Sequence, residues 1–203
     1  MSEGVVHIID DDAAMRDSLG FLMQVNRIPF RVFESAVAFL EDLPEDGGCV
    51  LTDVRMPEMN GIEMVRRLKE QGYRAPVIVM TGHADVPLAI EAMKAGVVDF
   101  IEKPFDEDLL LSAIKVALQQ GKAQSEQDAA LADTRARLEG LSPREREVLN
   151  GLIEGKANKV IAFDLGISPR TVEIYRANLM SKMQARSLSE LVRMTLSFND
   201  RNA

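Results

Sequence analysis

The chain has 203 residues, 46% of them hydrophobic, which is enough for one or two domains with apolar cores and excludes a disordered protein. The single cysteine, Cys49, excludes an internal disulfide framework and is typical of a reducing compartment. No apolar run approaches the ~18 residues of a membrane span, and the N-terminus lacks the pattern of a signal peptide, so we expect a cytoplasmic protein with no membrane contact.

The net charge of −8 is unevenly distributed along the chain. Residues 1–124 carry 12 basic and 21 acidic side chains, whereas residues 141–203 carry 10 basic and 7 acidic ones. An acidic part followed by a mildly basic part predicts two units with different partners.

Five short apolar segments alternate with five amphipathic segments in the first part of the chain. The predicted strands are residues 5–9, 30–33, 49–52, 76–81 and 97–101, and a helical pattern follows each of them. Ser35 is the expected N-cap of the second helix, and Gly96 is expected to close the fourth. The alternation predicts an α/β fold in which a five-stranded parallel sheet is covered by helices on both faces.

Residues 121–140 have a different composition, rich in Ala, Gln, Asp and Arg and without proline. This composition predicts a helix-compatible connector, and it leaves open whether Gly121 interrupts the helix. We therefore expect a first domain over residues 1–122, a helical linker over 123–139 and a second domain over 140–203.

The second domain contains three signatures of helix starts. Ser142 to Glu145 is a capping box with Pro143 at the first helical position, Ser168 precedes Pro169, and Ser187 to Glu190 is a second capping box. A further short helix, residues 159–165, ends at Gly166. The pattern predicts an all-α domain of four helices, with a helix-turn-helix centred on Gly166.

Polar side chains stand at the carboxyl ends of four predicted strands: Asp10 and Asp11, Asp53, Thr81 and Lys103. Helices on both faces place these ends on one edge of the sheet. Three crowded carboxylates repel one another unless a cation is present, and Mg²⁺ binds through carboxylates and phosphate oxygens. A single such residue is most often a turn or solvated residue, but the set predicts a phosphoryl-transfer site with an aspartate acceptor.

The second helix of the helix-turn-helix has one apolar face, formed by Val172, Tyr175, Leu179 and Met183, which we expect to be buried. The opposite face suits the major groove of DNA, and neighbouring basic residues suit phosphates. The candidate DNA-contacting residues are Lys159, Arg170, Thr171, Glu173, Ile174, Arg176, Asn178 and Lys182. The pattern alone is also compatible with a small helical bundle that binds protein.

Four groups of residues carry a family resemblance: Ile9-Asp10-Asp11, Asp53 with Met56-Pro57 and Gly61, Thr81-Gly82, and Lys103-Pro104-Phe105. Through them, residues 3–122 resemble the receiver domain of two-component response regulators. The resemblance implies a doubly wound, flavodoxin-like sheet and phosphorylation of Asp53 by a sensor histidine kinase. It also implies specific roles at the site. Mg²⁺ would be held by Asp11, Asp53 and the backbone carbonyl of Arg55, and Asp10 would contact it through water. Lys103, which would precede a cis bond to Pro104, would pair with the phosphoryl group. Thr81 and Phe100 would act as switch residues. His83, in the loop after Thr81, is expected to be solvated.

The second domain, over residues 140–198, resembles the LuxR-type DNA-binding domain. The resemblance is carried by Leu141 to Leu149, Gly155, residues 159–162, Thr171-Val172-Glu173 and Lys182. Tyr175 departs from this pattern, because the family more often has histidine there. The order of the two domains resembles the FixJ/NarL class, and residues 168–178 are most similar to its regulators of nitrogen-fixation and microaerobic genes. The resemblance implies a transcription factor, an activator that works with RNA polymerase, whose phosphorylation promotes dimerisation and binding to promoter DNA.

An alternative is a phosphate sink, in which the first domain drains phosphate from a kinase and the helical domain binds protein. An enzyme is not expected, because the second half of the sequence offers no convergent nucleophile, base and metal ligands.

Overall fold

The computed structural model describes residues 4–44, 48–82 and 86–199. Its residues divide into two compact units, Met1–Glu126 and Gln127–Ala203. In the described residues, no helix combines the length and the apolar character needed to cross a membrane.

The first unit is built on five parallel strands, β1 (Val6–Ile9), β2 (Phe30–Phe33), β3 (Cys49–Asp53), β4 (Val77–Thr81) and β5 (Asp99–Glu102). Their order in the sheet is β2-β1-β3-β4-β5, and every neighbouring pair is parallel. The chain therefore reverses its direction of travel across the sheet at β1 and β3, where open α/β folds place their binding sites. The α/β prediction is confirmed.

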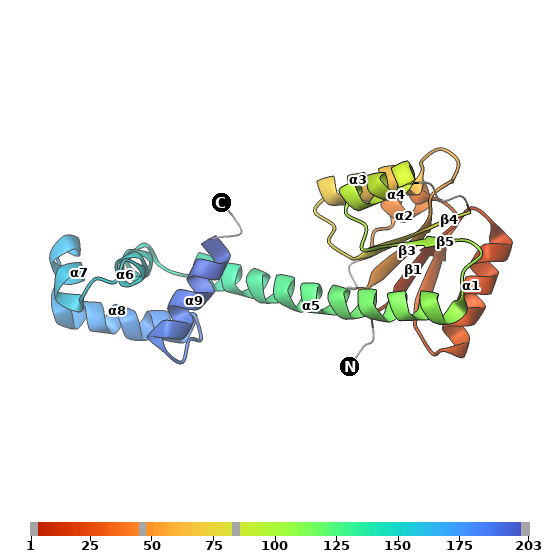
Figure 1. The fold of residues 1–203 in the computed structure, drawn as a ribbon. Helices are drawn as coiled ribbons and strands as arrows, with labels where there is room; N and C mark the ends of the chain where they lie inside the picture. The colour runs from red at the N-terminus through yellow and green to blue at the C-terminus, as the bar shows by residue number, and fades with distance from the viewer. Residues whose placement is uncertain (1–3, 45–47, 83–85, 200–203) are drawn as a thin grey trace. The chain divides into compact units, whose positions relative to one another are not determined.

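Helices cover both faces of this sheet (Figure 1). The helices are α1 (Ala13–Val25), α2 (Ala36–Glu41), α3 (Gly61–Glu70), α4 (Val86–Ala95) and α5 (Glu107–Glu139). One apolar core joins alternate strand residues such as Ile8, Leu51 and Met80 to α1 and α5. A second core joins the intervening residues, such as Val50 and Val79, to α2, α3 and α4. The period-2 alternation of strand side chains thus separates the two cores.

The fifth strand differs from its prediction, because it covers Asp99–Glu102 and not residues 97–101. Val97 is buried but lies in the connection that follows α4, and its N–H donates to Ala92 O at 3.3 Å. Gly96 closes α4 with a φ of 92°, which only glycine adopts without strain. Val97 therefore belongs to the end of α4, whereas Val98 N–H already donates to Val77 O of β4 at 2.8 Å, one residue before β5 begins.

Helix α5 is a single helix of 33 residues that passes through Gly121 without interruption. A Cβ atom on residue 121 would lie 2.2 Å from the backbone oxygen of Gly48, so glycine is required there by close packing on the sheet unit. The question that the sequence left open is therefore answered by a contact between two glycines.

The second unit contains α6 (Pro143–Ile153), α7 (Asn158–Leu165), α8 (Pro169–Lys182) and α9 (Leu188–Asn199). Its core is formed mainly by α6, α7 and α8, with Leu138 from the end of α5 and Leu191 from α9. The first predicted capping box is present: Ser142 N–H donates to Glu145 Oε2 at 2.8 Å, and Glu145 N–H donates to Ser142 Oγ at 3.3 Å. In the second, Glu190 N–H donates to Ser187 Oγ at 3.1 Å, but the Glu190 carboxylate accepts from Arg186 N–H at 2.8 Å, one residue before the predicted partner. The four-helix prediction is confirmed.

Candidate phosphoacceptor site and nucleic-acid interface

Asp53 ends a strand whose five residues are all buried, so the carboxylate is delivered to the sheet edge by a rigid element. Lys103 Nζ donates to Asp53 Oδ1 at 2.6 Å and to Asp10 Oδ2 at 2.9 Å. Burial by itself lowers the pKa of Lys103, but the hydrogen bonds and charges of Asp53 and Asp10 outweigh it and raise the pKa above its usual value. Lys103 is therefore held in its protonated form and is shared between the carboxylates of Asp53 and Asp10.

The loop between β1 and α1 holds Asp10 in place. Asp12 N–H donates to Asp10 Oδ1 at 3.0 Å, while the Asp12 carboxylate caps α1 by accepting from Ala14 N–H at 2.9 Å. Arg16 Nη1 donates to the carbonyl oxygens of Asp10 at 2.8 Å and Asp11 at 3.0 Å. Arg16 is not among the residues predicted from the sequence, although its position one to two helical turns after Asp10 and Asp11 is compatible with these contacts.

The loop between β3 and α3 packs closely against Asp53. Arg55 N–H donates to Asp53 Oδ2 at 2.5 Å, so the contact of Arg55 with Asp53 is made by its amide. A Cβ atom on residue 61 would lie 2.2 Å from Asp53 O. Gly61 is therefore required at the start of α3 by the close approach of the β3 backbone.

Thr81 and Phe100 lie on adjacent strands beside this site. Thr81 is fully buried, and its carbonyl accepts a hydrogen bond from Lys103 N–H at 2.7 Å. The bond between Lys103 and Pro104 is cis, as the resemblance implied. Phe100 is half-buried and packs against the core that includes α4. Their switch roles stay predictions, and His83 lies outside the described residues.

The site fits a hard divalent cation in part. Asp10 and Asp53 share one amine and therefore lie within the reach of one ion, and one or two carboxylates are the usual protein ligands of Mg²⁺. The side chain of Asp11 is exposed, and among the described residues no three His, Cys, Asp or Glu side chains are grouped to hold a metal. The structure thus brings together Asp10, Asp53 and Lys103, whereas Asp11 lies at the rim.

Helices α7 and α8 form the predicted helix-turn-helix. Gly166 ends α7 with a φ of 65°, and Ser168 Oγ caps α8 by accepting from Thr171 N–H at 3.1 Å. Val172, Leu179 and Met183 are fully buried, and Tyr175 packs partly buried against the same core. The predicted buried face of α8 is confirmed.

The candidate DNA-contacting residues differ in exposure. Lys159, Arg170, Glu173, Ile174, Asn178 and Lys182 are exposed, whereas Thr171 and Arg176 are half-buried. Three of the eight are engaged within the unit: Thr171 Oγ1 lies 2.8 Å from Ser168 Oγ, Arg176 Nη1 donates to Asn158 Oδ1 at 2.6 Å, and Lys182 contacts Glu145. Asn158 was not predicted as a partner of Arg176, because the two residues lie on different helices.

Lys182 Nζ donates to Glu145 Oε2 at 2.7 Å, and the Glu145 side chain is only 5% exposed. The hydrogen bond from Lys182 and then that from Ser142 N–H hold the pKa of Glu145 below its usual value. Glu145, which completes the capping box of α6, is therefore also the anion that holds Lys182 at the end of α8.

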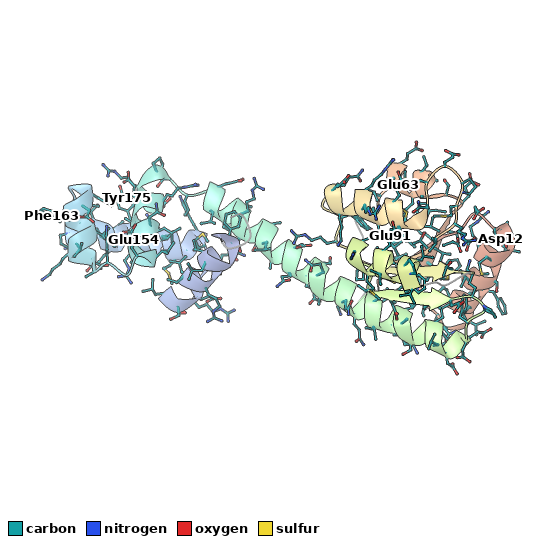
Figure 2. The ribbon with its side chains drawn as sticks, turned by 45° about the horizontal axis from the view of Figure 1, so that its top comes forward. Asp12, Glu63, Glu91, Glu154, Phe163 and Tyr175 are labelled. Atoms are coloured by element: carbon teal, nitrogen blue, oxygen red, sulfur yellow. The ribbon has the colours of Figure 1, made fainter. Side chains whose placement is uncertain are left out.

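One apolar side chain of α7 stands out from the helical unit. Phe163 is 87% exposed, and it extends outward from the helix (Figure 2). Its exposure is not predictable from the sequence, because Phe163 follows apolar residues in a short helical segment and resembles part of a buried stripe.

Two protein families match the chain, one for each unit. The response regulator receiver domain matches residues 6–115, and the luxR family of bacterial regulatory proteins matches residues 139–195.

Proteins of known function resemble the chain over nearly its whole length. It is 53% identical over 196 residues to the transcriptional regulatory protein FixJ of Bradyrhizobium diazoefficiens, covering 96% of each chain. It is 48% identical over 198 residues to FixJ of Rhizobium meliloti, covering 97% of each chain.

Two solved structures give the same result. Full-length FixJ from B. japonicum aligns with a TM-score of 0.58 at 52% identity and covers 98% of both chains. The response regulator StyR aligns with a TM-score of 0.85 at 35% identity, covering 97% of this chain and 100% of StyR. Because both domain families occur in this order and FixJ is similar from end to end, the chain belongs to the FixJ-type response regulators, which are DNA-binding transcription regulators and not enzymes.

Proposed function

We propose that this chain is a phosphorylation-switched transcriptional activator of the bacterial cytoplasm. A sensor histidine kinase phosphorylates Asp53, the phosphorylated chain forms a homodimer, and the dimer binds promoter DNA and works with RNA polymerase. By similarity to FixJ, the controlled genes are those of nitrogen fixation and microaerobic metabolism.

The observation that carries this proposal is the cation shared by two carboxylates, with Lys103 Nζ 2.6 Å from Asp53 Oδ1 and 2.9 Å from Asp10 Oδ2. In the proposed reaction, an oxygen of Asp53 attacks the phosphorus of a phosphohistidine and the phosphorus–nitrogen bond breaks. Lys103 then transfers its hydrogen bond from the carboxylate to a phosphoryl oxygen, which stabilises the negative charge that has moved there.

Asp10, Asp11, Asp53 and the backbone carbonyl of Arg55 would hold Mg²⁺ in this site. When bound, Mg²⁺ neutralises charge on the carboxylates and on the phosphoryl oxygens. The buried position of Asp10, which is 1% exposed, supports its role near the ion, and the exposed Asp11 is free to supply a further oxygen from the rim.

The proposed switch runs from Thr81 to Phe100. The Thr81 hydroxyl hydrogen-bonds a phosphoryl oxygen, which draws it toward Asp53 and lets Phe100 repack against α4. The surface of α4 and β5 then pairs with a second copy. Linking two weak DNA-binding units in one dimer raises the apparent affinity for a two-fold site by roughly 10²–10⁴.

Electrophoretic mobility shifts test the proposal directly. The chain is incubated with Mg²⁺ and acetyl phosphate and is mixed with promoter fragments selected from genomic DNA by the phosphorylated protein. We expect phosphorylated wild type to shift the DNA, and both untreated wild type and Asp53→Asn to shift it weakly. Equal shifts by all three proteins would contradict control by phosphorylation. A chain that is phosphorylated on Asp53 but selects and shifts no genomic fragment would instead favour the phosphate sink.

A further inference from the structure

A hydrogen bond joins the two helices of the helix-turn-helix outside their apolar core. Arg176, in the middle of α8, donates through Nη1 to Oδ1 of Asn158 at 2.6 Å, and Asn158 is the first residue of α7. Both side chains are half-buried. Because the two residues are 18 positions apart, the contact exists only when α7 and α8 are packed together.

The chemical nature of the partner distinguishes Arg176 from two lysines of this unit, Lys182 and Lys156. Lys182 pairs with Glu145 at 2.7 Å, and Lys156 pairs with Asp164 at 2.8 Å. A carboxylate holds a cation strongly but also neutralises it. Asn158 offers a neutral acceptor, so Arg176 is held in place while its positive charge is retained. That combination is useful where a polyanion approaches.

The hydrogen bond also restricts the geometry of the guanidinium group. A guanidinium carries five N–H donors in one plane, and a bond at one Nη fixes the direction of the others. The remaining donors suit phosphate oxygens or the edge of a guanine. Arginine otherwise loses much side-chain freedom when it binds, and a side chain that is oriented beforehand loses less.

We propose that Asn158 is a positioning residue for DNA binding: from the first turn of α7 it orients the Arg176 guanidinium of α8 for the DNA without neutralising it. The inference rests on DNA binding by this domain and on the expected contact of Arg176 with DNA. It adds a second residue, Asn158 on α7, to the residues of α8 that determine DNA binding.

A double-mutant cycle on the full chain tests the inference. Wild type, Asn158→Ala, Arg176→Ala and the double variant are phosphorylated with acetyl phosphate and titrated by fluorescence anisotropy. The probes are a duplex selected in vitro by the phosphorylated wild type and a random-sequence duplex. Asn150→Ala, at an exposed asparagine of α6, is the matched control and should bind as wild type does.

We expect Asn158→Ala to weaken binding about tenfold when Arg176 is present, the range of a hydrogen bond to a charged group, and to have no further effect in Arg176→Ala. Equal effects of Asn158→Ala in both backgrounds would overturn the inference, as would unchanged binding of Arg176→Ala. Failure of phosphorylated wild type to select and bind any duplex would instead reject the proposed function of the chain.

Asn158→Asp separates positioning from a merely structural role. Aspartate keeps the shape and the acceptor, so the contact between α7 and α8 is preserved, and a loss of DNA binding then reports on the charge at this position and not on the packing of the helices. Positioning predicts weaker binding than Asn158→Ala shows, because the carboxylate neutralises Arg176 and adds a negative charge facing the DNA. Wild-type binding by Asn158→Asp would therefore refute the inference.

Discussion

Replacement of Lys182 by methionine tests the buried anion of the helical unit. The Glu145 carboxylate is 5% exposed and loses the cation that lies 2.7 Å away, but it keeps the hydrogen bond from Ser142 N–H at 2.8 Å. Removing one partner of a fully buried ion pair costs about 3–5 kcal/mol, whereas exposed pairs contribute about 0–1 kcal/mol. Since the Lys182 side chain is 45% exposed, we expect Lys182→Met to lower the free energy of unfolding of this unit by an intermediate amount, about 1–3 kcal/mol at neutral pH.

The effect should depend on pH in a defined direction. The pKa of Glu145 is lowered in the folded chain, first by Lys182. Its contribution to the free energy of unfolding is therefore complete above the unfolded pKa of about 4.3 and is lost as the pH falls through the folded pKa. The difference between wild type and Lys182→Met should be largest above the unfolded pKa of about 4.3 and should shrink as the pH falls below it.

Tyrosine fluorescence provides the assay, because the chain has no tryptophan and two tyrosines, Tyr73 and Tyr175. In a Tyr73→Phe background, urea unfolding reports on Tyr175 and thus on the helical unit alone. Lys156→Met is the matched control, because its partners Asp164 and Glu154 are 40% and 58% exposed, so losing these exposed pairs should change the free energy of unfolding much less than losing Lys182 does. Equal losses in the two variants, or a loss for Lys182→Met that does not change with pH, would refute the reasoning.

Three further predictions concern the first unit and its activation. Mass spectrometry after treatment with acetyl phosphate and Mg²⁺ should find one phosphorylated residue, Asp53, and a label that persists in Asp53→Asn would contradict the assignment. Gly121→Ala should destabilise the receiver unit by about 1–3 kcal/mol in thermal unfolding, because the methyl group meets the Gly48 carbonyl oxygen; a stabilised variant would show that helix propensity outweighs this contact. Sedimentation velocity should find mainly monomer before phosphorylation and dimer after it, and the same dimer in both states would reject phosphorylation-driven assembly.

The local chemistry of the sequence determined the elements of this protein and the edge at which its site lies. Ser142, Ser168 and Gly166 act within one turn of the chain, so their roles as caps and helix terminus follow from neighbours three or four residues away. Asp10, Asp53 and Lys103 are far apart in sequence, but each ends or follows an apolar strand. Because parallel strands of a doubly wound sheet end on one edge, their convergence was predictable from the sequence alone.

Only the tertiary structure decided which polar groups pair and where close packing overrides composition. Glu145 and Lys182 are 37 residues apart, and Asn158 and Arg176 are 18 apart, so no local period reveals either contact. Position 121 lies inside a long helix but requires glycine, because the Gly48 backbone leaves no space for a Cβ atom there. Asp11 and Asp53 carry the same functional group, yet one is exposed and the other is held by Lys103. In each case the outcome depends on which surfaces meet in three dimensions, a property of the packed chain that residue type and local spacing do not contain.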